Sequence, residues 1–385
     1  MKYLIVAGEA SGDLHASRLM HALKERDSQA EFKFIGGDLM IKEGGTCIRH
    51  YRQTAYMGIV PVLIHLPQLV KTFLECRKVL LKWMPEALIL VDYPTFNLLL
   101  AKQATAFFGT SVWYYIPPKI WAWKEWRGEK IKEYVWETIA IFPFEVPYYK
   151  EKFKYDVHYL GNPTADEVRE FKKSYKETDE EFRKRYDLPD KKIIALLAGS
   201  RKQEIKDNLP AMIKATKHLA DKYNIVLAGA PSISEKRYKR FLKKSNVKLI
   251  DNDTYALLAH SSAALVTSGT ATLETALFNV PQVVCYETPF PKLIAWLRRH
   301  ILKVKYISLP NLIADKEVIK ELVADTFTVK NIRTELEKIL EDTPERKEML
   351  SQYAEIAQIL GDKSAPNETA QFMIDYMNEG IEEFL

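Results

Sequence analysis

A turn near the middle of the sequence combines residue types that suit a bound phosphate. In LLAGSRKQEI, Gly199 lets the chain turn sharply after an apolar run, and Ser200 can cap the helix that follows. Arg201 offers two parallel N–H donors beside the positive end of that helix, a geometry that phosphate and diphosphate groups accept. A capped helix with a surface arginine would give the same pattern, so this turn alone does not decide.

A second turn of the same kind follows later in the chain. In TSGTATLE, Ser268, Gly269 and Thr270 end an apolar run and begin a helix whose first N–H groups lack intrahelical partners. Glu274 lies one turn into this helix, where it could hold a ribose diol or simply favour the helix dipole. Two such turns at corresponding strand ends predict a site for a nucleoside diphosphate.

Other nucleotide and metal sites are disfavoured by the spacing of the residues. The first turn reads GEASGD rather than the G-x-G-x-x-G of dinucleotide enzymes, and no G-x-x-x-x-G-K-[ST] of a P-loop is present. None of the eight histidines forms an H-x-x-x-H pair, and Cys47, Cys76 and Cys285 are too far apart for a thiolate site. We therefore predict no protein-bound metal, no cofactor and a reduced, cytoplasmic protein.

Two aspartates in the first half of the chain are candidate general bases. Asp92 ends the apolar run ALILV and precedes Tyr-Pro, which prevents a regular continuation. Asp13 follows the turn GEASGD at the head of a helix. A carboxylate at the end of a buried strand could take the proton of an acceptor hydroxyl. The alternatives are a turn-forming role for Asp92 and a helix N-cap for Asp13.

Apolar and aromatic residues gather in two segments of the first half. YYIPPKIWAWKEWR carries Trp121, Trp123 and Trp126 after a Pro-Pro corner, and Met57 and Ile59 begin the stretch MGIVPVLIHLPQLV. Tryptophan clusters are either core or a docking place for apolar ligands. Together the two segments predict a surface that contacts acyl chains of the acceptor or a membrane.

Parallel strands are expected to position these residues. Continuous apolar runs alternate with helical stretches, a pattern typical of doubly wound α/β sheets covered on both faces. In such sheets ligands bind beyond the carboxyl ends of the strands, where the turns described above fall. The charged segment 165–192 indicates a domain boundary. We predict an N-terminal domain over 1–165, a second domain over 188–350 and C-terminal helices over 351–385.

The composition fits a globular protein that binds anionic ligands. The 385 residues are 47% hydrophobic, enough to bury more than one core, and 56 basic against 51 acidic residues give a net charge of +5. This modest excess does not demand nucleic acid. The basic segments 124–134 and 298–306 are interleaved with apolar residues, as at an anionic membrane surface or on ordinary amphipathic helices. Neither an export signal nor an apolar run long enough to span a membrane is visible.

The motifs taken together resemble those of the lipid-A-disaccharide synthase family. They run in order from the first strand to about Leu322: GEASGD (8–13), IGG, MGIV (57–60), D-x-P-x-F-N (92–97), P-x-x-W-A-W (118–123), PFE-x-x-Y (143–148), GSR-x-x-EI (199–205), TSGTATLE (267–274) and SLPN (308–311). No single motif is decisive. Their order and spacing together are highly specific.

The resemblance implies a GT-B fold, in which two Rossmann-like domains face a cleft and the final helix crosses back to the first domain. It also implies an inverting glycosyltransferase of lipid A biosynthesis. Such an enzyme joins UDP-2,3-diacylglucosamine to 2,3-diacylglucosamine 1-phosphate through a β-1,6 linkage and releases UDP. Similarity assigns nucleotide contacts to Ser200, Arg201, Ser268, Gly269, Thr270 and Glu274, a donor contact to Asn311, and the D-x-P-x-F-N aspartate to Asp92. Peripheral association with the cytoplasmic face of the anionic inner membrane, and a homodimer, are also expected.

The sequence departs from the family pattern at four positions. Ala198 replaces the usual proline before GSR, Pro61 replaces a glutamate after MGIV, and Asn162 replaces a histidine. Thr95 stands where a second aspartate is frequent. If Asp92 is the base, it therefore acts here without that second carboxylate.

Two other functions remain open from the sequence. A UDP-sugar 2-epimerase or another GT-B enzyme would share the fold and the UDP pocket. A non-enzymatic nucleotide-sugar sensor or membrane scaffold would need neither Asp92 nor Asp13. The apolar segments 57–70 and 116–126 favour the transferase, because an epimerase needs no acyl-binding surface.

Overall fold

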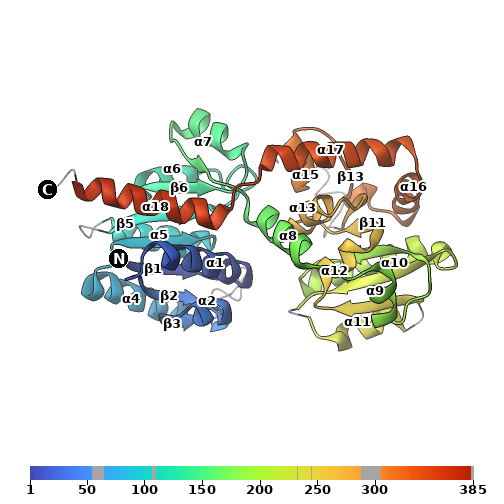
Figure 1. Cartoon of the computed structure of the whole chain (residues 1–385), viewed down its shortest axis with the longest axis horizontal. Coiled ribbons are helices and arrows are strands. Elements are labelled where there is room, and N and C mark those ends of the chain that lie inside the picture. Colours follow the sequence, from blue (N-terminus) through green and yellow to red (C-terminus); the bar gives the residue numbers. More distant parts are fainter. Residues whose placement is uncertain (54–64, 106–109, 232, 244, 288–304, 383–385) are drawn as a thin grey trace. The chain divides into compact units, whose positions relative to one another are not determined.

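The computed structural model describes residues 1–53, 65–105, 110–231, 233–243, 245–287 and 305–382 (Figure 1). Met57, Ile59 and Pro61 lie outside the described residues, as does most of the basic segment 298–306. The chain divides into two compact units. The first comprises Met1–Pro163 together with Asp362–Leu385, and the second comprises Thr164–Gly361.

The first unit is built on a seven-stranded parallel sheet. Its strands are β1 (Lys2–Ala7), β2 (Glu31–Gly36), β3 (Thr46–His50), β4 (Ala87–Val91), β5 (Ser111–Tyr115), β6 (Glu137–Ala140) and β7 (His158–Tyr159). They lie in the order β3-β2-β1-β4-β5-β6-β7, and each neighbouring pair is parallel. Because β4 and β5 are buried along their whole length, their apolar runs are unbroken.

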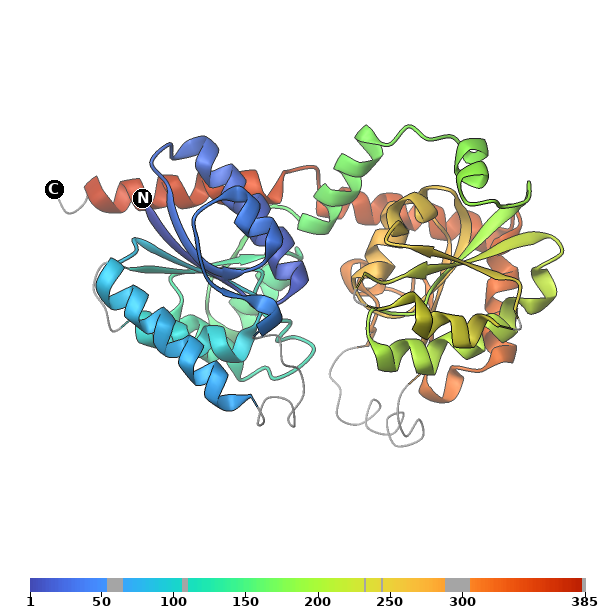
Figure 2. The same cartoon turned by 90° about the horizontal axis from the view of Figure 1, so that it is seen from below.

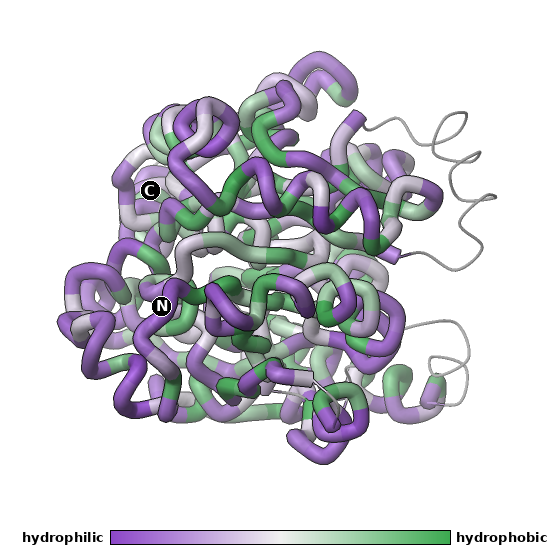
Figure 3. Tube along the Cα trace, turned by 90° about the vertical axis from the view of Figure 1, so that its right-hand side faces the viewer, coloured by the Kyte–Doolittle hydropathy of each residue, from purple (hydrophilic) through white to green (hydrophobic). Residues whose placement is uncertain are grey.

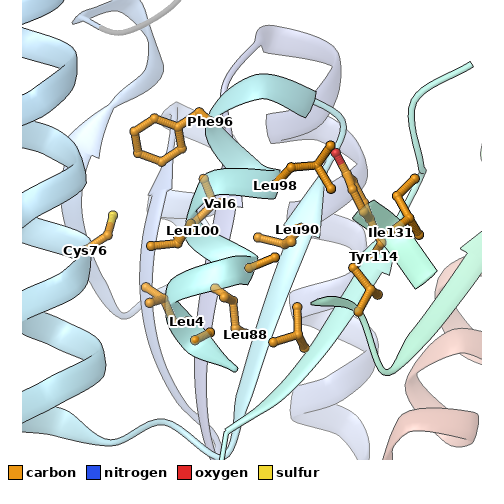
Figure 4. Close-up of a cluster of buried hydrophobic side chains, with 14 of the residues drawn as sticks. Leu4, Val6, Cys76, Leu88, Leu90, Phe96, Leu98, Leu100, Tyr114 and Ile131 are labelled. Carbon is orange, nitrogen blue, oxygen red and sulfur yellow. The ribbon is translucent and has the colours of Figure 1, made fainter. Parts of the chain in front are cut away.

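Helices cover both faces of this sheet (Figure 2). One face carries α1 (Ala10–Arg26), α2 (Asp38–Glu43) and α18 (Ala365–Glu382), and the other carries α4 (Leu66–Trp83), α5 (Pro94–Ala104), α6 (Arg127–Tyr134) and α7 (Glu145–Phe153). On the second face, Val6, Leu90 and Tyr114 from the strands pack with Leu100 of α5 and Ile131 of α6 (Figure 4). This core fixes the strand ends that carry the predicted base.

The C-terminal helix α18 packs on the first unit beside α1 (Figure 1). Met373 is fully buried, and Trp113 of β5 meets Phe372 edge-on with ring centroids 5.9 Å apart. Arg26 of α1 donates from Nε to Oε1 of Gln371 at 3.1 Å. The helix that precedes α18 belongs to the second unit, so the predicted segment 351–385 is divided between the two units.

The second unit repeats the design with six parallel strands. They are β8 (Lys192–Leu197), β9 (Tyr223–Gly229), β10 (Val247–Asp251), β11 (Ser261–Val266), β12 (Gln282–Tyr286) and β13 (Lys320–Val323), in the order β10-β9-β8-β11-β12-β13. The described helices are α8 (Pro163–Ser174), α9 (Asp179–Arg185), α10 (Lys202–Thr216), α11 (Glu235–Leu242), α12 (Thr254–Ala259), α13 (Thr270–Leu277), α15 (Leu309–Ala314), α16 (Val329–Leu340) and α17 (Pro344–Leu360). Figure 3 shows hydrophilic stretches mostly on the outside of the trace and hydrophobic stretches mostly in its interior. Two doubly wound parallel sheets therefore form the chain, as the apolar runs predicted.

The charged segment 165–192 contributes to the second core. Val168 of α8 and Phe182 of α9 are buried against strand residues such as Ala195. Thr178 caps α9 by accepting a hydrogen bond from the Glu181 N–H, and the Glu181 carboxylate accepts in return from the Thr178 N–H at 2.8 Å. Charged residues thus occupy the outer faces of helices whose inner faces are packed.

Each sheet has one place where the strand order changes direction. It lies between β1 and β4 in the first sheet and between β8 and β11 in the second. At such a switch point the neighbouring loops leave toward opposite faces of the sheet, and the crevice between them is the usual ligand site of open α/β sheets. Asp92 follows β4, whereas the GSR and TSG turns follow β8 and β11. The residues with the strongest chemical signals thus stand at the two switch points.

Candidate active site

The GSR and TSG turns of the second unit are held side by side. The Thr267 N–H donates to the Leu197 carbonyl at 2.8 Å, which links the ends of β11 and β8. Gly199 has φ of 108°, a conformation that L side chains rarely adopt, and an added Cβ would lie 2.6 Å from Cβ of Glu204. Glycine is therefore required where the chain turns into α10.

Glu204 organises the first of these turns. Its Oε2 accepts hydrogen bonds from the backbone N–H groups of Ser200 at 3.0 Å and Arg201 at 3.2 Å, and its Oε1 accepts from Nη1 of Arg201 at 2.9 Å. The prediction that Ser200 caps this helix is corrected, because no N-cap side chain accepts such a bond and the carboxylate of Glu204 takes that place. The side chain of Arg201 is 63% exposed and so remains accessible to an anion.

The TSG turn is open at its glycine. Gly269 precedes α13 with φ of 143°, and an added Cβ would meet no atom within 4 Å. Ser268 donates from Oγ to the Ile307 carbonyl at 3.0 Å, which joins this turn to the SLPN segment. Thr270 is exposed at the first position of α13. The turn therefore presents backbone rather than a crowded surface, as expected where a ligand approaches closely.

Glu274 lies in a cluster of acidic and phenolic groups. Its Oε1 accepts a hydrogen bond from the Tyr255 hydroxyl at 3.2 Å, and the same hydroxyl is 3.5 Å from Oε2 of Glu167 on α8. Burial and the charge of Glu167 raise the pKa of Glu274 and the bond from Tyr255 lowers it, which together place the pKa at about 7. A carboxylate that titrates near neutrality is suited to accept hydroxyl hydrogen bonds in its ionised form.

Asn311 is fully buried and hydrogen-bonded within the protein. Its Nδ2 donates to the Ile319 carbonyl at 2.9 Å and to Oε1 of Glu321 at 3.0 Å, while its Oδ1 accepts from the N–H groups of Val318 at 2.8 Å and Ile319 at 2.9 Å. These four bonds use the donors and acceptors of the amide. The predicted contact of this side chain with the donor sugar therefore finds no support in its geometry, which favours a role in shaping the SLPN segment.

Asp13 in the first unit is engaged in the same way. It is 3% exposed, and its carboxylate accepts from the N–H groups of Gly37 at 2.6 Å, Leu39 at 3.1 Å and Met40 at 3.2 Å. These N–H groups lie at the start of α2, where a negative charge is favourable. Asp13 is therefore not the N-cap of its own helix α1, whose N-cap is Glu9, but its carboxylate has a structural role at the start of the neighbouring helix α2.

The turn that carries Asp92 has a strained backbone that several hydrogen bonds hold in place. Asp92 and Tyr93 have φ of 44° and 46°, and Ile116, which accepts the Asp92 N–H at 3.1 Å, has φ of 65°. Non-glycine residues held in this region cost about 1–3 kcal/mol each and cluster at functional sites. Asn97 donates from Nδ2 to the Asp92 carbonyl at 2.7 Å, and the Tyr114 hydroxyl donates to the same oxygen at 2.9 Å. The backbone of Asp92 is thus fixed while its carboxylate stays half-buried.

Cationic groups surround the carboxylate of Asp92. Burial raises its pKa, whereas Lys119, the Tyr93 N–H, Arg127 and His15 each lower it. Lys119 lies in the loop after β5, and Arg127 begins α6. A carboxylate at a switch point, raised in pKa yet stabilised by neighbouring cations, has the properties of a general base.

Glu145 binds the loop that carries Trp121, Trp123 and Trp126 through a hydrogen bond from Trp121. It is fully buried, and its Oε1 accepts from Nε1 of Trp121 at 2.9 Å, while Oε2 accepts from the N–H groups of Ile141 and Phe142 at 3.1 and 3.0 Å. Burial raises the pKa of Glu145 more than these hydrogen bonds and Lys119 lower it, and the result is a pKa of about 7. Trp123 and Trp126 are different, since they are 65% and 56% exposed.

Several of these residues were given no role by the sequence analysis. Asn97, Lys119, Arg127 and Glu145 lie within or beside the motifs D-x-P-x-F-N, P-x-x-W-A-W and PFE-x-x-Y, which was the available signal. Glu145 is 24 positions from its partner Trp121, and Arg127 is 32 positions from its partner Thr95. Sequence spacing does not reveal such pairs.

Comparison with known proteins decides the family. The family model described as lipid-A-disaccharide synthetase matches residues 3–373. The chain belongs to the lipid-A-disaccharide synthase family. A lipid-A-disaccharide synthase of Myxococcus xanthus is 34% identical over 385 residues, covering 98% of both chains, and one of Nitrosococcus oceani is 35% identical over 363 residues, covering 93% of this chain and 92% of that one. A lipid-A-disaccharide synthase is a glycosyltransferase, and the chain is therefore an enzyme of this class.

Solved structures share the fold of this family member at low sequence identity. They include the S. aureus MnaA-UDP co-structure, with a TM-score of 0.68, 15% identity and coverage of 98% of this chain and 97% of that chain. UDP-GlcNAc 2-epimerase from Neisseria meningitidis bound to UDP-GlcNAc has a TM-score of 0.67 at 13% identity, covering 98% and 100%. The calicheamicin glycosyltransferase CalG4 has a TM-score of 0.61 at 14% identity, covering 98% of each chain. These likenesses confirm the GT-B fold, and the epimerases among them do not extend to function.

The described part of the chain shows neither a metal-binding cluster nor a membrane-spanning helix. There, no group of three or more His, Cys, Asp and Glu side chains could hold a metal ion. None of its described helices has the length and apolar character that crossing a bilayer requires.

Proposed function

We propose that this chain transfers 2,3-diacylglucosamine from UDP to the 6-hydroxyl of 2,3-diacylglucosamine 1-phosphate. The products are a β-1,6-linked disaccharide 1-phosphate and UDP. The match to the lipid-A-disaccharide synthase family over residues 3–373 is the observation that supports this reaction most strongly. The two turns at the second switch point and the carboxylate at the first supply the groups that such a transfer needs.

The UDP part of the donor is assigned to the second unit. Its diphosphate would meet Arg201 and the backbone of Gly269, where the helix start favours negative charge. The bond between Arg201 and Glu204 would have to open or be shared, and the exposure of Arg201 permits this. Glu274, with its pKa of about 7, would accept hydrogen bonds from the ribose hydroxyls when ionised.

Asp92 is assigned as the general base. Its carboxylate would take the proton of the acceptor 6-hydroxyl as that oxygen forms its bond to the anomeric carbon of the donor. The bond from the anomeric carbon to the diphosphate breaks in the same step, UDP leaves with the electron pair, and the α-linked donor yields a β-linked product. Asp92 is preferred to Asp13, because three backbone N–H groups already occupy the carboxylate of Asp13.

Association with an anionic membrane surface is a further part of the proposal. On α4, Leu66, Val70 and Leu74 are about half exposed at a spacing of four residues, which places them along one stripe of the helix. Trp123 and Trp126 are also exposed, and Nζ of Lys130 lies 4.9 Å from the ring centroid of Trp126. Apolar stripes bordered by cations suit the interface of an anionic bilayer. The fraction of protein that sediments with phosphatidylglycerol vesicles should therefore fall as the salt concentration rises. Binding that does not depend on salt would indicate apolar insertion without an electrostatic contribution.

The resemblance also leads us to propose a homodimer. Light scattering on the purified protein would then give twice the chain mass of 44.5 kDa. A mass of one chain at concentrations well above those of the assay would remove this proposal.

A direct transfer assay tests the proposed reaction. Purified protein is incubated in detergent with UDP-2,3-diacylglucosamine and 2,3-diacylglucosamine 1-phosphate, and both UDP and disaccharide are followed by mass spectrometry. Equal amounts of the two products are expected. Release of UDP without disaccharide would indicate hydrolysis, and conversion of the UDP-sugar to its 2-epimer would favour the epimerase reaction instead.

A further inference from the structure

Arg127 is a buried cation that has no carboxylate at salt-bridge distance among the described residues, although it interacts electrostatically with Asp92. It is only 8% exposed, and its Nη2 donates to the neutral hydroxyl Oγ1 of Thr95 at 3.1 Å. Its Nε is buried and makes no hydrogen bond, and among the described residues no carboxylate oxygen lies within 4.0 Å of the guanidinium. A guanidinium stays charged at any physiological pH, so this site contains positive charge that lacks a direct counter-ion.

A second cation lies in the same place. Lys119, in the loop after β5, interacts electrostatically with Asp92 and Glu145, and Arg127 interacts with Asp92 as well. Within the described chain Lys119 forms no ion pair at salt-bridge distance, and its side chain is exposed. Partial desolvation of the amine lowers the pKa of Lys119, and the charges of Glu145 and Asp92 raise it. Lys119 and Arg127 thus both interact with Asp92, and Lys119 also interacts with Glu145, whose pKa of about 7 leaves it partly ionised at neutral pH.

The two cations differ in a way that suits a phosphate group. A guanidinium binds two phosphate oxygens through a rigid planar fork, whereas an ammonium adds a mobile point charge from the solvent side. Thr95 and the ring of Trp126, whose centroid is 5.8 Å from Cζ of Arg127, restrict the orientation of the fork. The oxygens of a phosphate could bind the guanidinium directly, which no described carboxylate does.

We propose that Arg127 and Lys119 form a subsite for the phosphate of the acceptor, beside the base Asp92. This inference rests on the proposed function, in which the acceptor carries both a phosphate and the reacting hydroxyl on one sugar ring. Binding the phosphate next to Asp92 would hold the ring so that the 6-hydroxyl reaches the carboxylate. The subsite would therefore select phosphorylated acceptors and orient them, and Arg127 and Lys119 act on binding rather than on proton transfer.

The decisive experiment compares two acceptors with the same enzyme preparation. One is 2,3-diacylglucosamine 1-phosphate, and the other carries a methoxy group in place of the phosphate. The readout is the ratio of their kcat/KM values, which is independent of the fraction of folded enzyme. Wild type is expected to prefer the phosphorylated acceptor by about 10- to 100-fold, the range for a charge-assisted fork. Arg127→Gln should lose most of this preference, and Arg127→Lys should keep part of it.

Two further variants extend the comparison. Lys119→Gln removes an exposed side chain, so folding is not at risk, and should lower the preference several-fold. Lys132→Gln serves as the matched control, because it removes an exposed cation from the same helix as Arg127 and should leave the ratio unchanged. The KM for the UDP-sugar should stay the same in all four variants.

Three outcomes would overturn the inference. If Arg127→Gln slows both acceptors equally, Arg127 supports the fold or Asp92 and binds no phosphate, while the proposed function stands as long as wild type makes disaccharide. If Arg127→Gln keeps the ratio but loses binding to phosphatidylglycerol vesicles relative to phosphatidylcholine vesicles, the anion is a lipid headgroup. If wild type makes no disaccharide from either acceptor, the proposed function fails and the inference falls with it.

Discussion

The buried carboxyl of Glu145 should make the stability of the first unit depend on pH. Burial raises its pKa from the ordinary 4.5 to about 7 in the folded protein, whereas the unfolded chain keeps the ordinary value. Below pH 4.5 the group is protonated in both states and has no effect. Between these two values the unfolded chain loses the proton first, so the free energy of unfolding falls as pH rises. Above pH 7 the loss is complete.

The size of this effect follows from the shift. A difference of 7 − 4.5 = 2.5 pKa units corresponds to about 3 kcal/mol, most of which is lost between pH 5 and pH 7. Glu145→Gln removes the titration and keeps one amide oxygen to accept from Trp121 or from the backbone. The variant is therefore expected to be less stable than wild type at pH 5 and to lose less stability on going to pH 8.

Chemical denaturation followed by tryptophan fluorescence measures this difference. Six of the seven tryptophans lie in residues 1–163, so the signal reports mainly on the first unit. Glu43→Gln is a suitable control, because Glu43 is a partly exposed glutamate of the same unit. Parallel pH profiles for wild type and Glu145→Gln would refute the reasoning, since they would mean that Glu145 is ionised in the folded protein at an ordinary pKa.

Three further predictions concern the second unit. Arg201→Ala should raise the KM for the UDP-sugar about 10- to 100-fold, because the diphosphate loses a charge-assisted fork; unchanged donor kinetics would remove Arg201 from the site. Calorimetry should show that wild type binds the UDP-sugar more tightly at pH 8 than at pH 6, because Glu274 becomes ionised over this range. Glu274→Gln should abolish this rise in affinity. A wild-type affinity that does not change with pH would contradict the ribose assignment. Asn311→Ala should destabilise the second unit by about 2–3 kcal/mol, because buried partners of the amide lose their hydrogen bonds, and hydrogen exchange measures this loss. The KM for the UDP-sugar of the fraction that remains folded should change little, which a donor titration measures.

Much of the fold could be predicted from local patterns in the sequence. Runs such as ALILV (87–91) and SVWYY (111–115) are strands buried on both faces, and unbroken apolar character is what such burial requires. The GSR and TSG turns could be predicted as neighbours at one sheet edge, because parallel strands bring their carboxyl ends to the same side. The switch points followed only from the order of strands, which no local pattern encodes.

The finer features of the site depend on contacts between distant residues. Glu204 rather than Ser200 caps the GSR turn, because a carboxylate one turn into the helix reaches back to the N–H groups. Asn311 belongs to the SLPN motif, for which the family resemblance implied a contact with the donor sugar. Its side-chain amide is instead hydrogen-bonded to other groups of the protein. The neutral Thr95 is visible in the sequence, but its contact with Arg127 could not be foreseen, because the two residues are 32 positions apart. Burial and partner chemistry, which the sequence does not specify locally, decide these cases.

The most direct test of the proposed mechanism compares transfer by wild type and Asp92→Asn under the same conditions. Initial rates of disaccharide and UDP formation are measured at saturating substrates, and UDP binding is titrated for both proteins. If Asp92 is the base, the variant should fold and bind UDP normally while turnover falls by about two to four orders of magnitude. Asp92→Asn with turnover close to that of wild type would contradict the account and exclude Asp92 as the general base.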